Sequence, residues 1–227
     1  VACIMDGNRR YARSQQAPVG VGHAKGAVVA VRLLGWWLDY LAYQPAGPRV
    51  LTLWAFSSDN FKRSNDEVQI LFELMTAEFK ALAFSPLVHL FRMRVRVIGS
   101  RTHFPAAFIQ AIDLLESSTA SYSDLHLQLA VGYGGRDEVV ESVQRVLESG
   151  EAVTACAITR ESYCSRNGVP PVDLMLRTSE RRTSGFFLWD TQCAELHFVD
   201  KLWPELSQLD WLRALESFAQ REQRCGK

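Results

Sequence analysis

The chain has 227 residues, of which 25 are basic and 25 acidic, so its formal net charge at pH 7 is zero. This length allows one large domain with a sizeable hydrophobic core. The balanced charge provides no overall attraction to nucleic acid, and we therefore expect no nucleic-acid partner. The five cysteines are scattered and form no CxxC pair, which argues against a zinc site and a disulfide framework.

Strand-like apolar runs alternate with helical patterns along the chain. Six strands are predicted, at Ala2–Met5, Val50–Phe56, Arg94–Ile98, Leu125–Val131, Asp173–Arg177 and Glu195–Phe198. Helices are predicted at about Ala24–Tyr43, Asp66–Phe84, Pro105–Ser121, Asp137–Ser149, Arg160–Arg166, Gly185–Gln192 and Leu209–Arg224. This alternation predicts an α/β fold with a parallel sheet and helices on both of its faces. Because no repeat, low-complexity tract or linker divides the chain, we expect residues 1–227 to form a single domain.

Two of the predicted helices are unusually apolar. Residues 27–43 and 68–84 carry apolar side chains around most of the helix circumference, although a surface helix needs only one apolar stripe. These helices either belong to a thick core or a dimer interface, or they form the wall of an apolar cavity for a hydrophobic ligand. The pattern alone leaves both explanations open.

The expected location of the protein is the cytoplasm. The sequence contains no signal peptide and no apolar run long enough to span a bilayer. The odd number of scattered cysteines fits a reducing compartment. Any contact with a membrane is therefore expected to be peripheral.

The clearest functional signal begins at Asp6. A short apolar strand ends there and is followed by Gly7, Asn8, Arg9 and Arg10, which is typical of an anion and metal site at the carboxyl end of a parallel strand. The arginines can bind phosphate oxygens through bidentate hydrogen bonds. Because Asp6 and a phosphate are both negative, they fit together only if a hard cation such as Mg²⁺ lies between them. The alternative is an ordinary solvated loop between a strand and a helix.

Further polar clusters lie at the ends of predicted strands or before predicted helices. They are Gly22 to Gly26, Ala55 to Ser64, Gly132 to Arg136, Arg177 to Ser184, and Glu195. The arginines and hydroxyls of the fourth cluster indicate a second phosphate site, and the carboxylate of the fifth is a candidate ligand for a hard metal.

Each of these clusters also has a structural explanation. His23 could cap or pack a helix, and Ser64 with Glu67 fits a capping box. The glycines could form a turn, the arginines a solvated charge run, and Glu195 could be structural. Taken together, two phosphate sites, two carboxylates for one divalent ion and apolar helices suit a substrate with a diphosphate head and a hydrocarbon tail.

These motifs resemble the cis-prenyltransferase family, which includes undecaprenyl and dehydrodolichyl diphosphate synthases. The resemblance covers nearly the whole chain in order, through Met5–Ala12, Gly22-His23, Phe56–Arg63, Gly132–Arg136, Asp173–Thr178 and Ala194–Phe198. It implies a central, mostly parallel six-stranded sheet with an apolar tunnel, and a homodimer. It also implies that an allylic diphosphate ionises, that isopentenyl diphosphate attacks its C1, and that loss of a proton leaves a cis double bond.

The resemblance implies a role for each matching residue. The allylic diphosphate is expected to be surrounded by Asp6, Asn8, Arg10 and His23. The homoallylic diphosphate is expected to be held by Arg177, Arg182 and Ser184. Substrate orientation and proton removal are assigned to Ser57, Asn60 and Arg63. Mg²⁺ is assigned to Asp6 and to Glu195, the latter from the partner strand region. Further substrate contacts are expected from Gly7, Arg9, Tyr11 and Phe56.

Two departures from the family pattern leave the reaction type open. The family usually has an arginine four residues before the Gly-His histidine, where this chain has Val19, and the segment from Arg177 to Glu180 is one residue shorter than usual. The ending Arg224-Cys225-Gly226 retains the family's Arg-x-Gly pattern and favours a self-sufficient homodimer. We expect chain elongation, with irregular coupling or cyclisation of prenyl diphosphates, or a non-catalytic accessory subunit, as alternatives.

The aromatic residues of the two apolar helices bear on product length. These residues are Trp36, Trp37, Phe72, Phe79 and Phe84. If some of them point into a tunnel, the tunnel is short and so is the product. The alternative is that the rings pack against neighbouring helices or across a dimer interface.

Overall fold

The computed structural model describes residues 1–221, and six of its strands form one sheet in the order β3-β4-β2-β1-β5-β6. The strands are β1 Ala2–Ile4, β2 Val50–Ser57, β3 Met93–Ile98, β4 Leu125–Tyr133, β5 Leu174–Thr178 and β6 Glu195–Val199. Every neighbouring pair is parallel. The predicted α/β class is confirmed, and the largest error in a strand end is at β4, which continues past Val131 to Tyr133.

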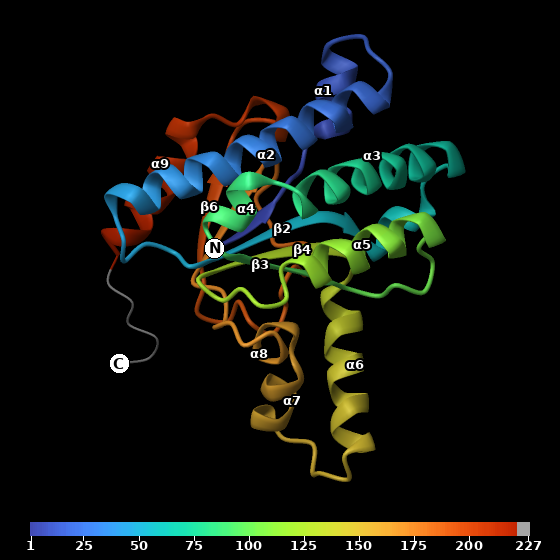
Figure 1. Cartoon of the computed structure of the whole chain (residues 1–227), viewed down its shortest axis with the longest axis vertical. Helices are drawn as coiled ribbons and strands as arrows, with labels where there is room; N and C mark the ends of the chain where they lie inside the picture. The colour runs from blue at the N-terminus through green and yellow to red at the C-terminus, as the bar shows by residue number, and fades with distance from the viewer. Residues whose placement is uncertain (222–227) are drawn as a thin grey trace.

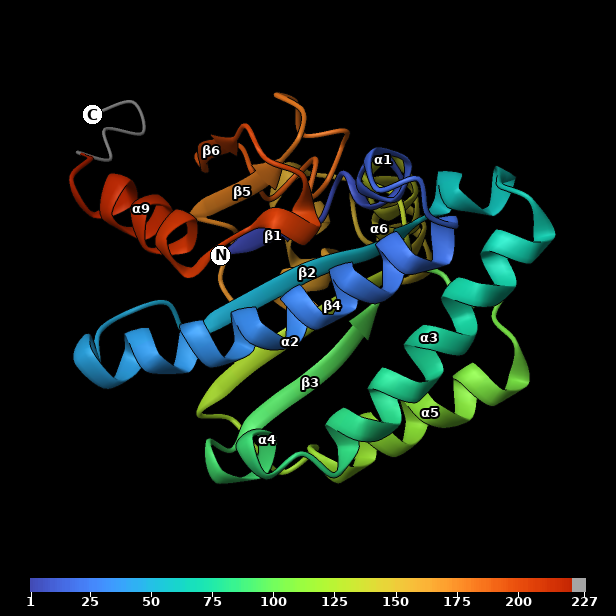
Figure 2. The same cartoon turned by 90° about the horizontal axis from the view of Figure 1, so that it is seen from above.

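Helices cover both faces of this sheet (Figure 1). They are α1 Asn8–Ser14, α2 Val19–Tyr43, α3 Asn65–Ala83, α4 Pro86–Leu90, α5 Ala106–Ser118, α6 Gly135–Glu148, α7 Ala155–Glu161, α8 Tyr163–Arg166 and α9 Gln208–Ala219, with 3-10 turns η1 Ser58–Lys62 and η2 Trp203–Glu205. Helices α2, α3, α5 and α9 contribute to the larger core cluster, and α8 contributes to the smaller one on the other face. Figure 2 shows α1 beside the end of the sheet toward which the β3 arrow points.

The first long helix begins earlier than predicted. Helix α2 starts at Val19 rather than Ala24, so His23 lies inside the helix and not before it. The predicted position of the Gly22-His23 cluster before this helix is therefore wrong. Glycines lower helix propensity, which led to the late predicted start. The structural reason for Gly22 is close packing, since a Cβ there would lie 2.1 Å from the backbone oxygen of Asn8 in α1.

Three further helix predictions differ from the structure. Residues 185–192 form consecutive turns rather than a helix, and Gly185 and Phe187 have positive φ angles of 80° and 46°. The predicted helix Arg160–Arg166 is divided at Ser162, whose ψ of 156° is extended. Helix α9 ends at Ala219, and the Arg224-Cys225-Gly226 ending lies outside the described residues.

The two apolar helices, α2 and α3, enclose an apolar cavity of about 110 Å³ against the sheet. Its wall includes Ala30 and Leu34 from α2, Met75 and Phe79 from α3, and Trp203. These helices therefore line a cavity and also supply much of the hydrophobic core, so the apolar pattern has both of the origins considered above. No helix within residues 1–221 is long and apolar enough to cross a membrane.

Only one of the five aromatic residues considered for product length lines this cavity, namely Phe79. Trp37 is fully buried and its Nε1 donates a 2.7 Å hydrogen bond to the Pro48 carbonyl. Phe72 packs against neighbouring rings such as Phe108, with ring centroids 5.2 Å apart. Phe84 is 71% exposed. The prediction of inward aromatic side chains therefore holds for Phe79, whereas Trp37 and Phe72 follow the packing alternative.

Candidate functional site

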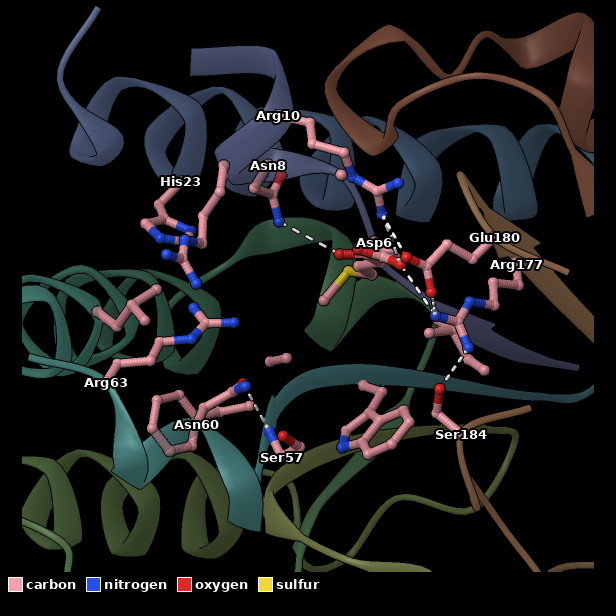
Figure 3. A pocket seen from close by; sticks show the side chains of 18 of the residues that line it. Asp6, Asn8, Arg10, His23, Ser57, Asn60, Arg63, Arg177, Glu180 and Ser184 are labelled. Atoms are coloured by element: carbon pink, nitrogen blue, oxygen red, sulfur yellow. Dashed lines mark hydrogen bonds and ion pairs between the residues drawn. The ribbon is translucent and has the colours of Figure 1, made fainter. Parts of the chain in front are cut away.

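A polar pocket of about 530 Å³ opens at the carboxyl ends of β1, β2 and β5 (Figure 3). The predicted site residues that line it are Asp6, Gly7, Asn8, Arg9, Arg10, His23, Phe56, Ser57, Asn60, Arg63, Arg177, Arg182 and Ser184. These residues come from segments far apart in the sequence, and the parallel sheet brings them together because its strands end at the same edge. Tyr11 and Glu195 are not among the lining residues.

Asp6 lies at the centre of the pocket, directly after β1. Its backbone N–H and C=O both hydrogen bond to the Thr178 hydroxyl, at 3.1 and 2.7 Å, which ties the end of β1 to the end of β5. Its carboxylate Oδ2 accepts from Arg177 Nη2 at 2.9 Å and pairs with Arg10 Nη2 at 3.1 Å. The next residue, Gly7, has a φ of 114°, a conformation that favours glycine. The chain can therefore turn sharply from β1 into α1 and place Asn8, Arg9 and Arg10 beside the acid.

One side of the pocket is an arginine clamp, which we define as Arg177, Arg182 and Ser184. The Arg177 side chain is only 4% exposed. Its Nη1 donates to Ser184 Oγ at 2.7 Å and to the Arg182 carbonyl, and its Nη2 donates to Asp6 and to Glu180. The structure thus connects the two arginine-rich clusters that the sequence places 171 residues apart.

Glu180 was missed as a site residue. Its carboxylate pairs with Arg177 at 3.1 Å, with Arg10 at 3.3 Å and with Arg182. The available signal was a single acid among three arginines between positions 177 and 182. A carboxylate at this position neutralises part of the clamp's charge when no anionic ligand is present.

The other side of the pocket contains His23, Arg63, Ser57 and Asn60 (Figure 3). The Ser57 backbone N–H donates to Asn60 Oδ1 at 3.0 Å, and this bond holds η1 against the end of β2. Burial lowers the pKa of His23 below its ordinary value, although the hydrogen bond to Glu67 opposes this shift. Glu67 also does not complete the predicted capping box. Its backbone N–H does donate to Ser64 Oγ, but its side chain is directed to His23 and Arg63.

The polar pocket and the apolar cavity adjoin each other. Both are lined by Met5, Asn8, His23, Ala55 and Leu71. A ligand that fits both would need an anionic head for the arginines and an apolar tail for the space between α2 and α3.

Glu195 lies far from Asp6 within one chain. It is the first residue of β6 and is level with Leu174 at the start of β5, whereas Asp6 follows the carboxyl end of β1. At about 3.3 Å per residue, the two are separated by roughly 16 Å along the strands. The Glu195 carboxylate instead pairs with Arg221. Residues 1–221 contain no group of three or more His, Cys, Asp or Glu side chains that could hold a metal ion.

Tyr11 also lies outside the pocket. It belongs to α1, and its backbone carbonyl accepts a 2.8 Å hydrogen bond from the Ser14 hydroxyl. The substrate contact expected of Tyr11 therefore has no support in the pocket's lining.

Comparison with known proteins gives consistent matches along the chain. The family model described as putative undecaprenyl diphosphate synthase matches residues 4–226. An isoprenyl transferase of Thermus thermophilus is 39% identical over 236 residues, which cover 99% of this chain and 87% of that protein. A tritrans,polycis-undecaprenyl-diphosphate synthase (geranylgeranyl-diphosphate specific) of Thermoplasma volcanium is 37% identical, with 100% and 88% covered.

Two solved structures match the fold over the whole chain. The lavandulyl diphosphate synthase from Lavandula x intermedia, in complex with dimethylallyl diphosphate, has a TM-score of 0.85 at 29% identity, covering 100% of this chain and 97% of that one. A probable undecaprenyl diphosphate synthase from Campylobacter jejuni has a TM-score of 0.81 at 28% identity, with the same coverage.

Proposed function

We propose that this chain, which belongs to the undecaprenyl diphosphate synthase family of prenyltransferases, condenses isopentenyl diphosphate with an allylic diphosphate to give a short cis-prenyl diphosphate. Membership of the family makes the chain a transferase and confirms the resemblance found in its sequence. The proposed substrates are supported by one observation, namely that an arginine-rich pocket adjoins an apolar cavity. The small cavity, about 110 Å³, supports a short product.

The two diphosphates are assigned to the two sides of the pocket. We place the diphosphate of isopentenyl diphosphate on the arginine clamp, because guanidinium groups bind phosphate oxygens in pairs. We place the allylic diphosphate beside Asn8 and His23, because these residues line both the pocket and the cavity that would take the allylic tail. Arg10 pairs with Asp6 and Glu180, the two acids that also hold Arg177.

In the proposed reaction, the C1–O bond of the allylic diphosphate breaks and the diphosphate leaves with the electron pair. The double bond of isopentenyl diphosphate attacks C1, and loss of a proton forms the new double bond. Arginines that are already held in place stabilise the negative charge on the departing diphosphate. Ser57, Asn60 and Arg63, on the same side of the pocket as His23, are proposed to orient the substrates for proton removal.

The residues of the pocket fit Mg²⁺ that binds together with a diphosphate. Mg²⁺ is commonly held by one or two carboxylates and by substrate phosphates, and the Asp6 carboxylate is 29% exposed at the pocket centre. When bound, the ion would neutralise charge on the diphosphate. Within one chain, Asp6 lies at the carboxyl ends of the strands and Glu195 at their amino ends. Their joint binding of Mg²⁺ therefore requires a second copy of the chain. The predicted homodimer therefore remains part of the proposal, as do a cytoplasmic location and peripheral contact with a membrane.

Irregular coupling of prenyl diphosphates is the second candidate function. The matching lavandulyl diphosphate synthase structure contains dimethylallyl diphosphate. Val19 and the shortened segment before Arg182 also depart from the family pattern described above. A non-catalytic accessory role is less well supported, because an accessory subunit has no need for the Asp6, Asn8 and Arg10 arrangement.

A product assay distinguishes these candidates. Purified protein with Mg²⁺ is incubated with labelled isopentenyl diphosphate, with and without an allylic primer, and in a third arm with a labelled allylic diphosphate alone. Elongation is expected to give labelled products only when the primer is present. Products formed from allylic diphosphate alone would indicate irregular coupling or cyclisation, and no turnover under any condition would contradict the proposed activity.

The arginine clamp can be tested with a neighbouring control. Arg182→Ala is expected to raise the KM for isopentenyl diphosphate about 10-fold, which corresponds to about 1.5 kcal/mol for a charged hydrogen bond. A charged hydrogen bond usually contributes about 1.5–3 kcal/mol. We expect the lower value here because the Arg182 side chain is 67% exposed. Arg181→Ala is the matched control, since Arg181 pairs with Asp200 outside the pocket. An increase confined to the KM for the allylic substrate would show that the two diphosphate positions are exchanged.

A further inference from the structure

One carboxylate contacts two arginines and a histidine on the allylic side of the pocket. The Oε1 atom of Glu67 accepts from Arg63 Nη1 at 2.8 Å and from His23 Nε2 at 3.1 Å, and it lies 3.7 Å from Arg9 Nε. All three of these side chains line the pocket. Glu67 does not line the pocket itself, but it contacts three side chains that do.

These three contacts join separate parts of the fold. Arg9 belongs to α1, His23 to α2, and Arg63 follows η1, while Glu67 lies in the first turn of α3. Long arginine side chains have many rotamers and lose entropy when they are fixed. A carboxylate that holds them before the ligand arrives reduces this loss during binding.

The environment keeps this carboxylate charged. The Glu67 side chain is 12% exposed. Burial alone would raise the pKa of Glu67, but the hydrogen bond from His23 and the charges of Arg63 and Arg9 hold it below its ordinary value.

We propose that Glu67 is a positioning residue for the allylic diphosphate, which it serves by holding His23, Arg63 and Arg9 at the entrance to the apolar cavity. This inference rests on the proposed function, because it assumes that the allylic substrate binds on this side of the pocket. The clamp is held separately, by Asp6 and Glu180. Removing the Glu67 charge should therefore affect one substrate and spare the other.

The test compares Glu67→Gln with Asp66→Asn. Both changes remove one negative charge from the first turn of α3, but Asp66 is exposed and is not among the residues that line the pocket. Binding of a non-reactive allylic thiolodiphosphate is measured by calorimetry, and the KM of each substrate is measured by turnover. Glu67→Gln is expected to weaken binding of the analogue about 10-fold and to leave the KM for isopentenyl diphosphate within about 2-fold, while Asp66→Asn changes neither.

Further variants remove ambiguity. Arg182→Ala should show the opposite pattern, with the KM for isopentenyl diphosphate affected and analogue binding retained. If Glu67→Gln fails to fold, Glu67→Asp, which keeps the charge but shortens the side chain, should also weaken analogue binding selectively. Unchanged binding by a folded variant, tighter binding, or an equal loss for both substrates would overturn the proposal. If the wild-type protein bound neither the analogue nor isopentenyl diphosphate, the proposed function itself would fail.

Discussion

Asp6→Ala is expected to lower prenyl transfer by at least about 100-fold while the protein remains folded. The loss should be large because Asp6 is the pocket carboxylate proposed to hold Mg²⁺ against a diphosphate, and loss of one oriented electrostatic contact commonly costs a factor of 10² to 10³. The fold should survive because Asp6 joins β1 to β5 through its backbone N–H and C=O. Alanine retains both of these groups.

The experiment measures turnover at saturating Mg²⁺ together with the thermal unfolding temperature. Asp59→Ala is a suitable control, because Asp59 lies in η1 near the pocket but pairs with Lys62 and does not line the site. A second readout is the gain in diphosphate affinity on adding Mg²⁺, measured with a non-reactive analogue, which should shrink in Asp6→Ala. A variant that turned over at a near wild-type rate would show that Asp6 is not the metal ligand.

Phe79→Ala is expected to lengthen the product and to cost about 3–5 kcal/mol of folding free energy. Phe79 is 4% exposed, and among the aromatic residues of α2 and α3 considered above it is the one that lines the cavity beyond the polar pocket. Replacing its ring by a methyl group enlarges the space for the tail. The stability loss follows from the lost packing, including contact with Phe108, whose ring centroid is 5.0 Å away.

Product length is measured by chromatography after extended reaction with labelled isopentenyl diphosphate. Phe84→Ala is the matched control, because Phe84 comes just after the same helix but is 71% exposed. It should leave both the product and the stability nearly unchanged. A folded Phe79→Ala protein with an unaltered product distribution would mean that this cavity does not hold the tail, and long products from the wild-type protein would contradict the short-chain proposal.

The sequence alone was enough to predict the sheet and most of the pocket. Buried parallel strands appear as short apolar runs, and the runs of β1, β2, β4 and β5 each lead into a different polar cluster. Because all parallel strands end at one edge, the clusters after β1, β2 and β5 had to lie near one another. Asp6, Ser57 and Arg177 meet in the pocket for this reason.

Pairing between side chains from distant segments could not be predicted in the same way. Glu67 fits the local pattern of a capping box with Ser64, but its side chain instead holds His23 and Arg63. A local motif predicts only contacts within a few residues. The direction of the Glu67 carboxylate depends on where α2 packs. This direction is favoured because Arg63 offers a full positive charge, whereas a capping box offers only a neutral backbone N–H.

Local sequence therefore determined the strands, their carboxyl ends and the polar residues that follow those ends. Apolar periodicity and strand ends are local properties. The tertiary structure decided which groups face each other. It placed α1 so close to α2 that a side chain larger than glycine does not fit at position 22 within the helix. It also separated Glu195 from Asp6. Parallel pairing places the start of β6 and the end of β1 at opposite ends of the strands. Such distances arise from packing between elements. They cannot be read from residue types and their spacing along the chain.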